Sequence, residues 1–376
     1  MMSLKWFLFC FVLKMWYSGV VAASAEDSEA KMGVEGDSEI NLASESSMLP
    51  PMFVLNLDRS KDRWEKASHV MREAGLEVQR FPAVDGRQLS IEELRRESTR
   101  IATFLQPRGV IGCYLSHKRF WNMVVDQDLD AAIVFEDDVE LVDGFKEKLL
   151  SNMLKLRAEK PEDQDFDVIL LGAIGRVHPQ AKDAIGSLFF SHYIGGKRPL
   201  KLINDYRYQP RRPAGTHAYM VSRKGAEKLL KLCSKATYHV DLDAWRHPDL
   251  DITMFRPMLA YQTFEHTSLT DVSRDRNPVA TSLLKTGPMM ALREWAADPH
   301  TRQPWSHVFA EPLIQFGQHG PVLTVERHCI IFCSFMAAAG AFEYRGQRKR
   351  ALYALGGGMG FVTTIRSIIW LLMNWR

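Results

Sequence analysis

The sequence predicts an α/β fold with a mostly parallel central sheet that helices cover on both faces. Short apolar runs typical of buried strands alternate with segments whose apolar residues recur at helical spacing. This alternation is typical of doubly wound sheets. Polar and charged residues follow two of the runs directly, at residues 56–63 and 136–138. Because such sheets bind ligands at the carboxyl ends of their strands, both segments are candidates for a site.

The first half of the pattern is a βαβ unit. Residues 52–57 are the first expected strand, a polar turn opens a helix that Gly75 ends, and residues 78–83 are the second strand. A polar helix is expected over residues 91–100. Gly109 and Gly112 then allow close backbone approach before a helix that begins near Ser116 and runs to Val125.

The second half is less regular. A third strand at residues 131–135 precedes an amphipathic helix at residues 143–158, with Phe145, Leu149, Leu150 and Leu154 on one side. Residues 176–213 are expected to form loops and short strands over the ligand site. The remaining expected elements are a strand at 166–171, a strand at 215–221, a helix at 225–232 and a strand at 261–264.

Composition excludes some function classes. The chain has 376 residues, of which 46% are hydrophobic and 25% are charged, as is ordinary for a globular protein. Its 48 basic and 45 acidic residues leave a net charge of +3. Because this balance creates no strong positive field, we expect no nucleic-acid partner.

The N-terminal 50 residues differ from the rest of the chain. Lys5, the apolar run at residues 6–13 and the small residues Ala23 and Ala25 indicate a signal peptide over residues 1–25, with a retained signal anchor as the alternative. Residues 26–50 are rich in Ser, Glu and Asp, which predicts a disordered stem. We therefore expect a folded domain at residues 51–320 in the lumen of the secretory pathway, in the endoplasmic reticulum or Golgi.

The tail at residues 321–376 is apolar. Its longest apolar segment, residues 351–373, has the length of a membrane span, but Arg366 near its centre would cost several kcal/mol there. The glycines at residues 356–358 also weaken a helix. Membrane contact and soluble packing both remain open for this tail.

The apolar run at residues 131–135 ends in three consecutive carboxylates, Glu136, Asp137 and Asp138. Carboxylate oxygens are hard ligands that suit Mg²⁺ or Mn²⁺, and such ions hold the phosphates of activated substrates. A solvated acidic turn is the alternative interpretation.

Five segments in order make the first interpretation stronger. They are VLNLDRSKDR (54–63), FPAVDG (81–86), GVIGCYLSH (109–117), FEDD (135–138) and GTHAYMVS (215–222). Together they resemble glycosyltransferase family 25, which includes bacterial lipooligosaccharide galactosyltransferases and procollagen galactosyltransferases. The resemblance covers about residues 52–266.

The resemblance implies a GT-A-like nucleotide-sugar-binding fold that moves a sugar, most often galactose, from a UDP-sugar to a hydroxyl of a glycan or glycoprotein acceptor, with inversion. It implies Mn²⁺ or Mg²⁺ as cofactor, with Asp138 as direct ligand, Glu136 as its companion and His266 as a further ligand. A catalytically inactive relative that acts in binding or adhesion is the alternative function.

The resemblance also implies a set of donor-binding residues: Asn56, Arg59, Arg63, Asp85, Gly86, Ser116, His117 and Asp137. Two of them have a second interpretation, because Arg63 could be a surface charge paired with Asp62 and His117 could be a buried structural hydrogen bonder. Inverting transfer needs a base for the acceptor hydroxyl. We expect Asp241 in that role, with Asp243 as substitute, unless one of them caps the following helix.

Overall fold

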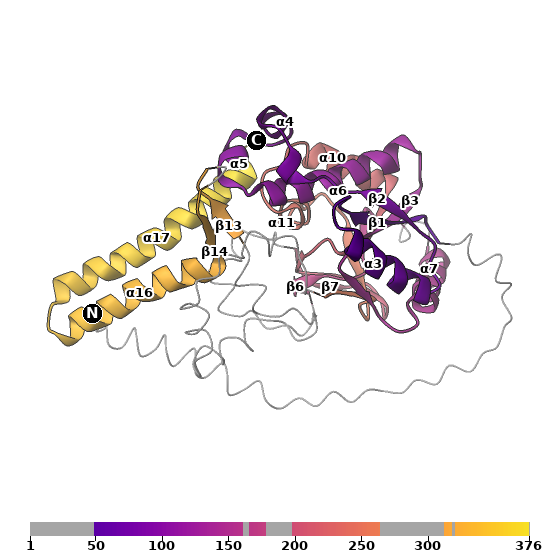
Figure 1. Ribbon diagram of the computed structural model, residues 1–376. Helices are drawn as coiled ribbons and strands as arrows, with labels where there is room; N and C mark the ends of the chain where they lie inside the picture. The colour runs from indigo at the N-terminus through magenta and orange to yellow at the C-terminus, as the bar shows by residue number, and fades with distance from the viewer. Residues whose placement is uncertain (1–48, 161–164, 178–197, 264–311, 318–319, 376) are drawn as a thin grey trace.

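The computed structural model describes residues 49–160, 165–177, 198–263, 312–317 and 320–375 (Figure 1). Eight strands form the central sheet: β1 (Met52–Asn56), β2 (Val78–Pro82), β3 (Ala131–Glu136), β5 (Val168–Leu170), β7 (Lys201–Leu202), β8 (Arg207–Gln209), β10 (Ala218–Ser222) and β11 (Ile252–Phe255). Their spatial order is β2-β1-β3-β10-β5-β11-β8-β7. Only β10 and β8 run against the direction of the others, which confirms the mostly parallel α/β sheet.

Helices cover both faces of this sheet. The helices of the domain are α3 (Lys61–Glu73), the 3₁₀ turn η1 (Gly86–Gln88), α4 (Ile91–Glu97), α5 (Arg100–Leu105), α6 (Arg108–Asp126), α7 (Phe145–Ala158), α10 (Arg223–Leu232) and α11 (Val240–Ala244). Successive residues of β1 point to opposite faces. Phe53 and Leu55 pack with residues of α6, α10 and α11, whereas Met52 and Val54 pack with residues of α3 and α7.

Three of the expected helices differ from the observed ones. The helix expected at residues 91–100 is two short helices, α4 and α5, because Ser98 and Thr99 leave the helical conformation and Thr99 caps α5. The helix expected from near Ser116, α6, begins at Arg108, so both glycines of the 109–117 segment lie inside it. In α7, Met153 and Leu156 are buried, whereas Leu154 is exposed.

Among the residues that the structure describes, three strand pairs lie outside the central sheet. They are β4 (Val139–Leu141) with β12 (Ala260–Gln262), β6 (Ile174–Arg176) with β9 (Arg212–Ala214), and β13 (Pro312–Gln315) with β14 (Val322–Thr324). The pair β4–β12 matters for the site, because it fastens the segment that follows β3 to residues more than a hundred positions later.

The C-terminal tail is a helical hairpin of α16 (Val325–Tyr344) and α17 (Arg348–Asn374), which extends away from the domain (Figure 1). Ile365, Ile369 and Leu372 of α17 pack with Ala102 of α5 and with Leu313 beside it, so one end of the hairpin is anchored to the domain. Among the described residues, these two helices are long and apolar enough to cross a membrane.

Some predictions lie outside the described residues. The signal peptide at 1–25, most of the stem at 26–50 and His266 are among them.

Candidate active site

The candidate site lies where β3 ends. Because β10 is antiparallel to β3, its amino end lies beside the carboxyl end of β3, and Ala218 pairs with Phe135. The amide N of Glu136 donates to the carbonyl of His217 at 2.9 Å. The acidic segment at residues 136–138 and the Gly215-Thr216-His217 segment are thus joined by the sheet itself.

Glu136 faces helix α6. Its Oε1 accepts a hydrogen bond from the Thr216 hydroxyl at 2.6 Å and lies 3.4 Å from Nε2 of His117. Burial alone would raise the pKa of Glu136, but the hydrogen bonding and charge of His117 outweigh it, and with Thr216 they lower this pKa to about 2. Glu136 is therefore a carboxylate at neutral pH.

Asp137 points toward β1 and α3. Its Oδ2 accepts from the Asn56 amide at 2.6 Å, and its Oδ1 pairs with the Arg63 guanidinium. Burial raises the pKa of Asp137, while the Arg63 charge and the Asn56 hydrogen bond act in the opposite direction. Arg63 therefore pairs with Asp137, and its side chain is only 19% exposed, which disagrees with its interpretation as a surface charge.

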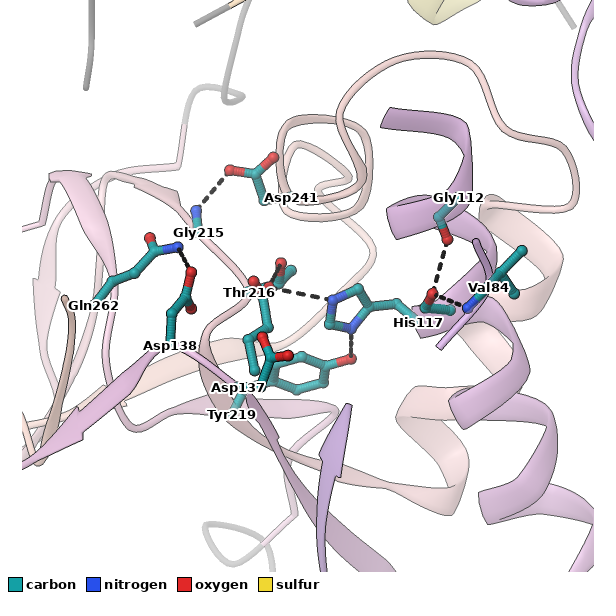
Figure 2. Close-up of polar contacts among 12 residues, drawn as sticks. Val84, Gly112, His117, Asp137, Asp138, Gly215, Thr216, Tyr219, Asp241 and Gln262 are labelled. Carbon is teal, nitrogen blue, oxygen red and sulfur yellow. Dashed lines mark hydrogen bonds and ion pairs between the residues drawn. The ribbon is translucent and has the colours of Figure 1, made fainter. Parts of the chain in front are cut away.

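Of the three carboxylates, Asp138 has the least complete set of hydrogen-bond partners. Its Oδ2 lies 3.2 Å from the Gln262 amide and 3.3 Å from Arg63, but its Oδ1 is buried and has no hydrogen-bond partner. Burial and the charge of Glu136 raise the pKa of Asp138 to about 7. Figure 2 shows Gln262 reaching this carboxylate from the neighbouring segment.

The charge around Asp138 suits a cation. Three carboxylates meet here, and burying an uncompensated negative charge costs free energy. A divalent ion at Oδ1 of Asp138 would compensate it, and hard oxygen ligands are those that Mg²⁺ and Mn²⁺ prefer. The residues present therefore fit the expected metal, with Asp138 as the better placed ligand because Glu136 is turned toward α6.

Ser116 and Gly86 have packing roles. The Ser116 hydroxyl donates to the Gly112 carbonyl and accepts from the Val84 amide, both at 2.8 Å (Figure 2). A Cβ on Gly86 would lie 1.8 Å from the carbonyl O of Arg108. Both residues thus hold the 84–86 loop against α6.

Arg59 and Asp85 form an ion pair beside the end of β1. Arg59 Nε lies 2.7 Å from Asp85 Oδ2, and the other Asp85 oxygen caps η1 through the Arg87 amide at 3.1 Å. The Arg59 side chain is 38% exposed. Asp85 therefore orients Arg59, whose guanidinium remains open to a ligand.

His117 is fully buried in the third turn of α6. Its Nδ1 lies 3.0 Å from the Tyr219 hydroxyl, which also accepts from Trp121 Nε1 at 2.8 Å. This chain of contacts agrees with the structural interpretation of His117, and it turns the other ring nitrogen toward Glu136 (Figure 2).

Asp241 and Asp243 differ sharply although both lie on α11. Asp241 Oδ2 accepts from the Gly215 amide at 2.6 Å, next to the Thr216 that holds Glu136 (Figure 2). Asp243 is fully buried and accepts from Tyr114 and Thr237 at 2.7 Å and from Arg246 at 3.1 Å. Its enclosure does not suit a base, whereas Asp241 lies beside the acidic segment.

The sequence interpretation missed three residues that shape the site. Thr216 holds Glu136, Gln262 reaches Asp138, and Arg80 of β2 donates to Asn56 Oδ1 at 2.9 Å. Thr216 lies within the quoted GTHAYMVS segment, so its signal was present. Gln262 arrives through the β4–β12 pairing, which no local pattern indicates.

Comparisons with known proteins agree with this arrangement. The family described as "Glycosyltransferase family 25 (LPS biosynthesis protein)" matches residues 49–243. Procollagen galactosyltransferase 2 of Homo sapiens is 30% identical over 188 residues, which is 48% of this chain and 27% of that protein. A "Glycosyltransferase 25 family member" of Drosophila melanogaster is 29% identical over 190 residues, 48% of this chain and 28% of its own length.

A "Probable inactive glycosyltransferase 25 family member 3" of Bos taurus is 31% identical over 187 residues, 48% of this chain and 28% of that protein. The chain thus spans less than a third of the length of these three relatives. Among solved structures, A197 from STIV is similar with a TM-score of 0.30 and 10% identity, over 57% of this chain and 85% of that chain, which supports no conclusion. Because the family match spans more than half of its residues, the chain belongs to glycosyltransferase family 25.

Proposed function

We propose that this family 25 protein is a metal-dependent glycosyltransferase that moves a sugar from a UDP-sugar to a hydroxyl of a glycan or glycoprotein. Galactose is the sugar that we favour. The observation that carries the proposal is Asp138 at the end of β3, with a buried oxygen that has no hydrogen-bond partner. The procollagen galactosyltransferases among the relatives support galactose as the sugar.

Asp138 would hold Mn²⁺ or Mg²⁺, with Glu136 close by. The bound ion supplies charge neutralisation for the two phosphates of the leaving UDP. Asn56 and Arg63 keep Asp137 fixed beside it. Arg59, oriented by Asp85, offers a guanidinium suited to phosphate contact at the carboxyl edge of the sheet.

Asp241 is the proposed base. It is partly exposed, and the Gly215 amide fixes one oxygen at 2.6 Å, which leaves the other for an acceptor hydroxyl. With that proton accepted by Asp241, the hydroxyl oxygen would bond to the anomeric carbon as the bond from this carbon to UDP breaks on the opposite face, which inverts its configuration. The anomeric configuration of the product, measured by NMR, tests this part of the proposal.

The experiment for the whole proposal measures transfer and hydrolysis of UDP-galactose and UDP-glucose with and without Mn²⁺. Asp138→Ala is compared with Asp143→Asn, an exposed acid five residues later. We expect metal-dependent turnover in the wild type and in Asp143→Asn, and its loss in Asp138→Ala. Equal turnover by all three proteins would overturn the metal assignment.

The alternative function is that of an inactive binding or adhesion protein. One relative, from Bos taurus, is described as a probable inactive family member, which supports this alternative. It predicts no turnover with any UDP-sugar and no rise in melting temperature on adding UDP with Mn²⁺. The buried carboxylates favour the enzyme, because a binding surface gains nothing from the cost of burying Asp138.

We also place the domain in the secretory lumen, attached to the membrane through the α16–α17 hairpin. Tyr344 and Tyr353 are 91% and 78% exposed at its tip, and Trp370 and Trp375 are 48% and 65% exposed at its base. Aromatic side chains at both ends are typical of membrane-embedded helices.

The tip between the two helices carries Arg345, Arg348, Lys349 and Arg350. A basic turn of this kind favours the cytoplasmic side of a membrane. Carbonate extraction of the expressed protein tests the attachment: the full chain should stay with the membrane, and a chain ending at residue 324 should be released if residues 1–25 are cleaved. Release of the full chain by carbonate would overturn the hairpin as an anchor.

A further inference from the structure

Helix α6 brings a thiol and an imidazole to Glu136. Cys113 and His117 are four residues apart on α6, so their side chains lie on one face of the helix. One ligand atom of each, together with a carboxylate oxygen of Glu136, lies within 4.8 Å of the other two. Nothing in the proposed sugar transfer uses Cys113.

One distance in this cluster is close to that between two ligands of a tetrahedral metal ion. His117 Nε2 and Glu136 Oε1 are 3.4 Å apart. Two nitrogen or oxygen ligands of a tetrahedral Zn²⁺ ion are about 3.3 Å apart, given metal–ligand bonds of about 2.0 Å. One edge of the site is therefore already at ligand spacing, and the thiol sulfur lies within 4.8 Å of both ligand atoms.

His117 is held in the orientation that a metal ligand needs. Its Nδ1 is engaged by the Tyr219 hydroxyl, which Trp121 fixes in turn. Its Nε2 is buried and faces Glu136, with Glu136 Oε1 3.4 Å away. Metal-binding histidines are typically fixed in this way through the second ring nitrogen.

The charges also balance. A Cys113 thiolate and the Glu136 carboxylate carry two negative charges, which a divalent ion neutralises. Cys113 is only partly buried, which leaves a route for a metal ion to enter the site. It forms no disulfide among the described cysteines. A mixed sulfur, nitrogen and oxygen ligand set suits Zn²⁺ better than the hard ions expected at Asp138.

We propose that Cys113, His117 and Glu136 form a second metal site, of the zinc type, with its fourth position open to water. Such an ion fixes Glu136 to α6 and leaves Asp138 as the ligand of the donor-bound ion. The site does not depend on sugar transfer, so its test is separate from that of the proposed function.

The test uses the untagged full chain in detergent, freed of metal by a chelator and titrated with Co²⁺ alone. A thiolate bound to Co²⁺ gives an intense charge-transfer band in the near ultraviolet, which an oxygen site lacks. We expect this band in the wild type at one equivalent, and its displacement by one equivalent of Zn²⁺. Asp138→Ala should keep the band.

The matched variants are Cys113→Ser and Cys333→Ser, since Cys333 is an exposed cysteine on α16. We expect the band to disappear in Cys113→Ser and His117→Asn and to persist in Cys333→Ser. Absence of the band in the folded wild type would overturn the site. Persistence of the full band in Cys113→Ser would overturn it equally, because another thiol would then bind the ion.

Discussion

The segment at residues 136–138 and helix α11 each carry two aspartates, and the two segments differ in how those carboxylates are satisfied. On α11, Asp243 is fully buried and accepts three hydrogen bonds, whereas Asp241 accepts one and is partly exposed. After β3, Asp137 is held by Asn56 and Arg63, whereas Asp138 keeps one buried oxygen without a partner. Saturated carboxylates hold the structure, and incompletely satisfied ones are available for chemistry.

The largest expected effect is on catalysis, at Asp241. Asp241→Asn should lower kcat by about 10²- to 10⁴-fold, because the amide cannot take the acceptor proton. Stability should change little, since the Asn oxygen can still accept from the Gly215 amide. Activity and melting temperature are compared with those of Asp249→Asn, an exposed aspartate nearby. Wild-type kcat in Asp241→Asn would remove it as the base.

Asp243 should instead affect stability. Asp243→Asn places an amide N–H₂ against groups that all donate, Tyr114, Thr237 and Arg246, so we expect a loss of about 3 kcal/mol in the free energy of unfolding. Denaturant unfolding measures it, again beside Asp249→Asn. A loss under about 0.5 kcal/mol would mean that the two aspartates of α11 do not differ as described.

Arg63 tests the other segment. Arg63→Gln removes the guanidinium that pairs with Asp137 and Asp138, and we expect a loss of about 1 to 3 kcal/mol in stability. Affinity for Mn²⁺ should not fall, because a positive charge near the ligand has been removed. Calorimetric titration with Mn²⁺ checks this, and a fall as large as that in Asp138→Asn would contradict it.

Thr216 should give the smallest effect. Thr216→Val removes one hydrogen bond to Glu136, which we expect to cost about 1 kcal/mol, and Thr216→Ser should restore it. Thermal unfolding of the two variants makes the comparison. Equal melting temperatures for Val and Ser would show that the Thr216 hydroxyl does not support Glu136.

Local patterns predicted most of the fold. The strands at β1, β2 and β3 and the helix α3 follow from apolar runs and helical spacing, and Gly75 ends α3 with a φ of +66° as expected. The reversed direction of β10 could not be predicted, because pairing direction depends on where distant strands meet and not on their own residues.

The segments that form the candidate site were also predictable from the sequence. The carboxylates after β3 and the polar residues after β1 do meet, because the carboxyl ends of parallel neighbouring strands lie at one edge. The side chains of Ser116 and Asp243 bond to segments that only the tertiary fold brings near, so these contacts could not be predicted from the sequence. Burial of polar side chains cannot be inferred from the local sequence alone.

The most direct test of the account is Mn²⁺ binding by the wild type and Asp138→Asn in the presence of UDP, followed by electron paramagnetic resonance of the free ion. The account predicts that the wild type and Asp143→Asn remove the free Mn²⁺ signal at one equivalent and that Asp138→Asn leaves it. Equal Mn²⁺ binding by Asp138→Asn and the wild type would contradict the account.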